Sequence, residues 1–165
     1  SPGATIDQDA IDYNTHLAYQ SLLIQGYSDE TIYLMASYQY NTVDNDATHQ
    51  NIEYAIKNWA KDNDAELVLY LIGNGHSHYF DLNPQELLSA SDLNSWLDDF
   101  QNELSVDLTL IMDSSQSGHF ISHLKSTDDQ KRIIICSTSE NQNALFLSKG
   151  LISFSGFSGR KFKME

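Results

Sequence analysis

The sequence predicts an α/β fold in which helices cover both faces of a mostly parallel sheet. Two patterns indicate this class. Several short runs are apolar throughout, as expected of strands that are buried on both faces. Segments with apolar residues at helical spacing lie between these runs, so that helices and strands alternate along the chain. The 165 residues contain no linker and no internal repeat, so we expect one domain over residues 1–165.

The first part of the chain is predicted to form a helix, a short strand and a loop. Apolar residues recur at helical spacing from about Asp9 to Gln25, and Gly26 is a suitable residue to end that helix. Thr31 to Met35 is a short β-prone run. The stretch from Asn41 to Ala47 is polar, and we expect it to be a loop.

The rest of the chain is predicted to alternate between helices and buried strands. Thr48 and Ser91 are each expected to cap a helix N-terminus, because a short side-chain oxygen can accept a bond from a free backbone N–H there. The predicted strands are Leu67–Ile72, Leu108–Met112 and Arg132–Cys136, and a last helix is expected over Leu145–Phe154.

The net charge of the chain limits the classes of partner that we expect. Nine basic residues against 23 acidic ones give a net charge of −14. Nucleic acids and anionic membrane surfaces are therefore disfavoured, because both need clustered Lys and Arg. The longest apolar run, Leu67 to Ile72, is too short to cross a bilayer, and no signal peptide is visible at the N-terminus. We expect a soluble protein.

The candidate site lies where the predicted strands end. In parallel sheets, ligands bind outside the carboxyl ends of the strands. Small, polar and imidazole side chains follow three of these strands, at residues 73–78, 113–119 and 137–140. A nucleophile on a tight turn, backbone amides near a glycine and a histidine on the neighbouring strand end are the parts of an acyl-transfer site. The pattern therefore favours that chemistry.

The sequence from Asp113 to Gly118 (DSSQSG) resembles the Asp-x-Cys-x-Ser-Gly nucleophile motif of the caspase-like cysteine peptidases, and most closely the legumain-like bacterial members. The resemblance covers roughly Ala10 to Ser155 and includes residues 67–72, 87–97 and 137–144. It implies a three-layer α/β/α sandwich, a bacterial origin, and a peptide or protein as substrate or ligand. It implies no cofactor.

Both residues of the catalytic dyad depart from the family pattern. The nucleophilic Cys falls on Ser115, and the His of the family's His-Gly pair falls on Asn74, with Gly75 after it. A hydroxyl is far less acidic than a thiol, and an amide cannot carry a proton, so we expect no cysteine-peptidase turnover. The interpretation is a pseudo-peptidase, natural or engineered. His76, two residues later, is the nearest candidate imidazole.

The resemblance also assigns the surrounding residues. Gly75 falls in the family's oxyanion hole, and Asp113, Ser137 and Ser139 fall beside the peptide-binding cleft. The family opens with an apolar strand that lies centrally in the sheet, and this chain begins near the turn that follows it. We therefore expect another segment or chain to supply that strand, and the sequence to be a fragment or processed piece of a longer one.

Two other functions stay open. One is a serine hydrolase in which Ser115 is the nucleophile, His76 the base and Asp113 the carboxylate. The other is a protein-interaction module without catalysis. A serine-directed phosphonate should label the serine hydrolase. It should label neither the interaction module nor the pseudo-peptidase.

No metal is expected. His76, His78 and His119 are three imidazoles at two strand ends, but the sequence indicates no fourth ligand. His119 and His123 are spaced four residues apart, and we expect them on an exposed helix face. The single cysteine, Cys136, excludes an internal disulfide and a Cys-rich zinc site, and we expect a buried, inert thiol.

Overall fold

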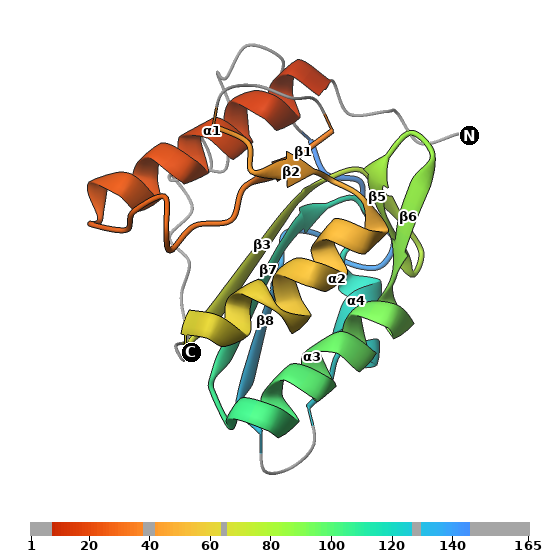
Figure 1. Ribbon diagram of the computed structural model, residues 1–165. Coiled ribbons are helices and arrows are strands. Elements are labelled where there is room, and N and C mark those ends of the chain that lie inside the picture. The colour runs from red at the N-terminus through yellow and green to blue at the C-terminus, as the bar shows by residue number, and fades with distance from the viewer. Residues whose placement is uncertain (1–7, 38–41, 64–65, 127–129, 146–165) are drawn as a thin grey trace.

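Three parallel strands form the centre of the fold. A computed structural model describes residues 8–37, 42–63, 66–126 and 130–145 of the protein. The strands are β3 (Leu67–Gly73), β7 (Leu108–Ser114) and β8 (Arg132–Cys136), in the order β3-β7-β8 (Figure 1). These are the three apolar runs of the sequence. An α/β fold with a parallel central sheet is therefore confirmed.

One face of this sheet is covered by helices α2 (His49–Lys57) and α3 (Ala90–Leu104), which lie side by side in Figure 1. A short 3-10 helix, η1 (Trp59–Asn63), follows α2, and the short α4 (Gly118–His123) packs against α3. Their apolar side chains and those of the sheet form one buried cluster, which includes Ile52, Ile56, Leu93, Leu97, Phe100, Leu110, Met112 and Phe120.

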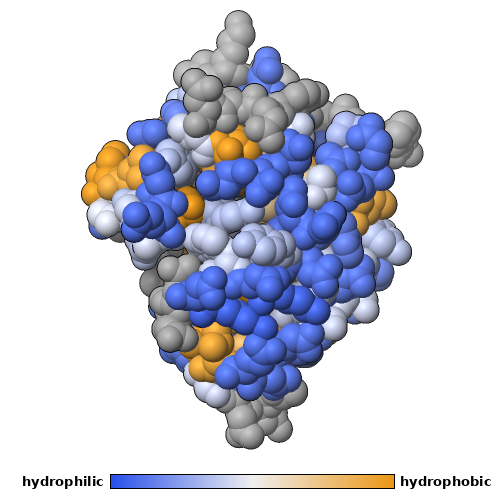
Figure 2. All heavy atoms as spheres, viewed as in Figure 1, coloured by the Kyte–Doolittle hydropathy of each residue, from blue (hydrophilic) through white to orange (hydrophobic). Residues whose placement is uncertain are grey.

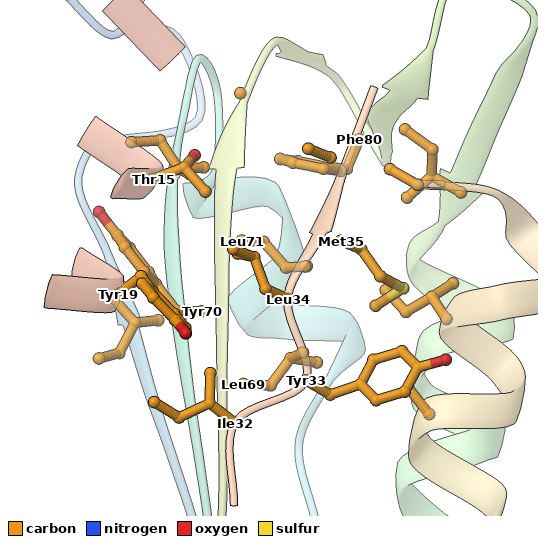
Figure 3. Close-up of a pocket in the computed structure, with 18 of the residues that line it drawn as sticks. Thr15, Tyr19, Ile32, Tyr33, Leu34, Met35, Leu69, Tyr70, Leu71 and Phe80 are labelled. Atoms are coloured by element: carbon orange, nitrogen blue, oxygen red, sulfur yellow. The ribbon is translucent and has the colours of Figure 1, made fainter. Parts of the chain in front are cut away.

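Helix α1 (Gln8–Ile24) packs against β3 from the side opposite α2 (Figure 3). The prediction from Asp9 to Gln25 is confirmed, with Gly26 beyond the end at a φ of 98°. No described helix has the length and apolarity that a membrane crossing requires. Hydrophilic side chains dominate the face of the molecule that carries α2 and α3 (Figure 2).

The strand predicted at Thr31–Met35 is mostly wrong. Only β1 (Met35–Ala36) pairs with another strand, and its partner β2 (Asn45–Asp46) lies in the stretch expected to be a loop. Leu34 instead donates its N–H to the Asp44 carboxylate at 2.7 Å, so a side chain replaces part of the strand ladder. A pattern of apolar residues does not predict such a bond between a side chain and the backbone.

A further sheet, separate from the central sheet and from the β1–β2 pair, was not predicted. It consists of β4 (Gly75–His76), β5 (Tyr79–Asn83) and β6 (Glu86–Ser89), which are antiparallel. Phe80, Leu82 and Leu88 are its buried apolar residues. Phe80 and Leu82 alternate with polar residues in the sequence, but strands this short do not make the alternation stand out.

Two helix starts can be compared with prediction. Thr48 caps α2, as expected, by accepting a hydrogen bond from Asn51 N–H at 3.2 Å. Ser91 does not cap α3; Ser89 does, by accepting from Asp92 N–H at 3.0 Å, so the helix begins earlier. The helix expected over Leu145–Phe154 lies, after Leu145, outside the described residues.

Candidate functional site

The ends of β3 and β7 meet at the carboxyl edge of the sheet. The register pairs Gly73 with Ser114, so Gly75 follows beside Ser115. A Cβ atom on Gly75 would lie 2.9 Å from the carbonyl oxygen of Ser115 and 3.1 Å from Ser114 Oγ. Only a residue without a side chain allows the two backbones to approach this closely. Gly75 and Ser115 therefore lie side by side at this edge of the sheet.

Ser115 lies in the turn that joins β7 to α4, and Gln116 fixes that turn. Gln116 has a φ of 57°, which side chains rarely adopt. Its N–H donates to the carbonyl of Gln142 at 2.8 Å, and its Oε1 accepts from Ser77 N–H at 2.8 Å. Loops from three regions of the chain are thereby joined around one strained residue, which is a pattern of functional sites.

The hydroxyl of Ser115 is engaged by backbone. Ser115 is 9% exposed, and its Oγ accepts a hydrogen bond from Ala144 N–H at 3.0 Å. Within the described residues, no imidazole hydrogen-bonds to this hydroxyl. A serine needs a base in contact to become a nucleophile, so this arrangement does not activate Ser115.

His76 lies on the β4–β5 hairpin and faces the carboxylate of Asp81 rather than that of Asp113. Its Nδ1 is 3.3 Å from Asp81 Oδ1, and its ring is 5.9 Å from that of Tyr79. The imidazole side chain is 54% exposed. Asn74, two residues earlier, accepts a hydrogen bond from Asp81 N–H on its carbonyl at 3.1 Å. His76 and Asn74 therefore both contact Asp81, His76 through its side chain and Asn74 through its backbone.

Asp113 is buried, with 4% of its surface exposed, two residues before Ser115. Burial raises the pKa of its carboxyl to about 6, and a hydrogen bond with the Ser137 side chain opposes that rise. Ser137 also donates its N–H to the Met112 carbonyl at 3.0 Å, extending the β7–β8 ladder. Asp113 and Ser137, both expected to bind substrate, thus bind one another.

Thr138 is a site residue that the sequence reading missed. Its Oγ1 donates to the carbonyl of Ser114 at 2.8 Å and accepts from Ser117 N–H at 3.1 Å. It therefore ties the end of β8 to both sides of the Ser115 turn. A threonine in a polar loop carries no signal of this role in the sequence.

Ser139 lies against the start of α4. A Cβ atom on Gly118 would be 2.9 Å from the carbonyl carbon of Ser139 and 2.8 Å from the nitrogen of Glu140. The final glycine of the DSSQSG motif is thus needed for close backbone approach. Ser139 stays at the rim of the site, where its N–H is 3.4 Å from Gln142 Oε1.

The structure brings the imidazoles of His78, His119 and His123 together, whereas His76 pairs with the Tyr79 ring instead. The ring of His78 is 4.9 Å from that of His119 and 4.4 Å from that of His123, both in edge-on contact. His119 and His123 lie on α4 as expected; His123 is exposed, whereas His119 is half-buried. Among the residues that the structure describes, no group of three or more His, Cys, Asp or Glu is arranged to hold a metal ion.

No protein-family model matches the chain, and no curated protein is significantly similar to it. The resemblance to caspase-like peptidases therefore rests on the sequence motif alone.

A cavity of about 890 Å³ lies beside β3. Asn74 is at its lining, but Ser115 is not. The cavity and the candidate nucleophile position at Ser115 are thus separate features of the molecule.

Proposed function

We propose that the chain is an inactive caspase- or legumain-like peptidase domain that binds an extended peptide without cleaving it. One observation carries the proposal. The hydroxyl of Ser115, at the position of the nucleophile, accepts a bond from Ala144 N–H, while the imidazole of His76 lies against Asp81, with Nδ1 3.3 Å from Asp81 Oδ1. The turn at Ser115, the close-packed Gly75 and the loop at Thr138 support an acyl-transfer site in which no imidazole of the described residues contacts the hydroxyl.

The chemistry of these groups is the reason why we expect no turnover. Attack on a peptide carbonyl needs a thiolate, or a hydroxyl whose proton is removed as it attacks. Asn74 can donate a hydrogen bond but cannot accept and release a proton. Loss of a single member of such a catalytic group costs several orders of magnitude in rate.

The edge of β8 supplies the means of binding a peptide. In the part of the chain that the structure describes, β8 pairs with β7 alone. Leu108 N–H donates to Lys131 and Ser137 N–H to Met112, so residues 131, 133, 135 and 137 face β7. The backbone groups of Arg132, Ile134 and Cys136 then point outward and can pair with an added strand.

The charge of the protein favours one class of peptide. A net charge of −14 attracts basic ligands over acidic ones. We therefore expect bound peptides to be extended and rich in Lys and Arg.

The test is cleavage of a mixed peptide library by four forms. These are the chain as given, Ser115→Cys, Ser115→Cys with Asn74→His, and the matched control Ser114→Cys with Asn74→His. We expect cleavage only by Ser115→Cys with Asn74→His, because the control moves the thiol by one residue. If no form cuts while all remain folded by circular dichroism, either the site binds peptides at most or the missing first strand has cost the site its shape.

A serine-directed phosphonate tests the hydrolase alternative on the same samples. We expect no labelling of the chain as given. Labelling that disappears in Ser115→Ala would establish Ser115 as a working nucleophile and overturn the pseudo-peptidase.

A further inference from the structure

Three imidazoles from two distant parts of the chain meet on one surface of the molecule. His78 lies in the turn between β4 and β5, and His119 and His123 lie on α4. The ring centre of His78 is 4.9 Å from that of His119 and 4.4 Å from that of His123. Half of the six histidines of the chain are therefore gathered at one place.

The spacing of these rings is the spacing that a shared metal ion requires. With Zn–N distances of about 2.0–2.1 Å and ligand angles of roughly 90–110°, two imidazoles on one ion have ring centres about 4.5–5.2 Å apart. His119 and His123 are also four residues apart on a helix. Two histidines at that spacing lie on one helix face and can bind the same zinc ion.

The three side chains keep the freedom to turn. As placed, their rings meet edge to face, and the nitrogens do not converge on one point. In the part of the chain that the structure describes, none of the three forms an ion pair with a carboxylate, whereas His49 and His76 each do. The rings can therefore rotate about their side-chain bonds until each aims a nitrogen at one ion.

The backbones that carry the imidazoles are fixed by contacts that do not involve the rings. In the hairpin, Ser77 donates its N–H to Gln116 Oε1 at 2.8 Å, and the His78 carbonyl accepts from Ala90 N–H at 2.9 Å. On α4, Phe120 is 1% exposed and packs in the core. Ligands on backbones that are already fixed lose less freedom when they bind an ion.

The donor set selects the class of ion. Imidazole nitrogens suit Zn²⁺, Cu²⁺ and Ni²⁺, whereas Mg²⁺ and Ca²⁺ take oxygen ligands. Three histidines with a water molecule in the fourth position complete the coordination of zinc. The net charge of −14 also attracts cations to the surface of the protein.

We propose that His78, His119 and His123 together bind one first-row transition-metal ion, with water in the remaining position. The ion joins the β4–β5 hairpin, which carries Gly75, to α4, which follows Ser115. This proposal stands on the positions of the three imidazoles and does not rest on the proposed function.

The experiment is a calorimetric titration of the protein with ZnCl₂ in excess MgCl₂. Magnesium occupies carboxylate sites on the acidic surface and does not compete for imidazoles. We expect one Zn²⁺ ion per chain, with a dissociation constant in the micromolar range. In NMR spectra, zinc should shift the ring signals of His78, His119 and His123. It should leave those of His16, an exposed histidine of α1, unchanged.

Single substitutions test each ligand. His78→Gln, His119→Gln and His123→Gln should each weaken zinc binding by at least about tenfold, since loss of a group that merely supports a metal ligand already has such an effect. His16→Gln and His76→Gln are the matched controls, because each removes an imidazole outside the cluster, and both should leave the affinity unchanged. Circular dichroism of the zinc-free variants establishes that each is folded.

Three outcomes would overturn the proposal. Zinc binding that excess Mg²⁺ abolishes would place the ion on the acidic surface. Binding that is lost in His119→Gln and His123→Gln but unchanged in His78→Gln would reduce the site to a helical pair without the hairpin. The absence of binding by the folded parent would show that the three rings do no more than contact one another.

Discussion

At the scale of single residues, Gly75 shows how the site depends on backbone contact. Its Cα position borders Ser115 and Ser114 so closely that a methyl group would overlap both. Gly73, on the same strand, has a Phe80 ring atom as its nearest neighbour, 3.1 Å from a built Cβ. A ring edge can shift, whereas the carbonyl of Ser115 is fixed by the turn.

We therefore expect Gly75→Ala to destabilise the protein by about 1–3 kcal/mol, as overpacking typically does. Gly73→Ala, the matched control, should cost less because a side chain yields more easily than backbone. Urea unfolding monitored by tryptophan fluorescence measures both. Equal losses would mean that backbone contact at Gly75 is not what restricts the site.

Asp113 makes stability depend on pH. Burial raises the pKa of its carboxyl from 3.8 to about 6, so the folded state binds this proton more tightly than the unfolded state. The favourable contribution is complete below pH 4 and is lost as pH rises through about 6. The loss is at most about 3 kcal/mol at pH 7, from about two pKa units.

Asp113→Asn keeps the shape and removes the charge, so we expect this variant to be more stable than the parent at pH 7 and similar to it at pH 4. Urea unfolding at pH 4, 5, 6 and 7 gives the comparison. Asp62→Asn, an exposed control, should change the difference between pH 4 and pH 7 little. If the difference in unfolding free energy between the parent and Asp113→Asn stays constant over this pH range, the raised pKa of Asp113 is contradicted.

At the scale of elements, the start of α3 separates two serines that look alike in sequence. Ser89 Oγ accepts from Asp92 N–H at 3.0 Å and donates to Asp92 Oδ2 at 2.7 Å. Ser91 lies inside the first turn and is exposed. Ser89→Ala should therefore lower the free energy of unfolding by about 1 kcal/mol, and Ser91→Ala should change it little. Thermal unfolding of the two variants decides which serine is the cap.

The join between β8 and α3 depends on Arg132. Its side chain is 0% exposed and donates to Asp98 Oδ1 at 2.9 Å, Asn94 Oδ1 at 2.9 Å and the Leu124 carbonyl at 3.0 Å. Arg132→Lys cannot reproduce this fork of donors and leaves buried acceptors unpaired. We expect a loss of about 3 kcal/mol or more in unfolding free energy.

Lys131 provides the control at the neighbouring position. It pairs with Asp107, but both side chains are largely exposed, so Lys131→Ala should have a small effect. If the two variants unfold at the same urea concentration, the buried network of Arg132 does not hold β8 to α3.

At the scale of the whole molecule, the net charge of −14 acts against compactness through self-repulsion. Added NaCl screens this repulsion, so we expect the thermal midpoint near pH 7 to rise between low salt and physiological salt. The same addition near pH 4.5, where the net charge approaches zero, should raise it much less. A rise of equal size at both pH values would attribute the effect to the salt itself rather than to charge.

The sequence determined the elements whose residues satisfy one local rule. Continuous apolar runs located β3, β7 and β8, helical spacing located α1, α2 and α3, and the DSSQSG motif located the turn at Ser115. Each of these signals is written in neighbouring residues, because burial on two faces or one fixes the pattern of apolar side chains. The placement of Gly75 beside Ser115 followed from the rule that parallel strand ends share an edge.

Tertiary structure alone decided which groups bind one another. His76 lies against Asp81, and Ser137 binds Asp113. Ala144 donates to Ser115, and Thr138 joins two loops. Each of these contacts depends on how the packed chain positions groups that are distant in the sequence. The cavity beside β3 is a property of the same kind, because segments distant in the sequence line it. Residue order fixes local patterns, whereas contacts between distant residues form only when the whole chain has packed.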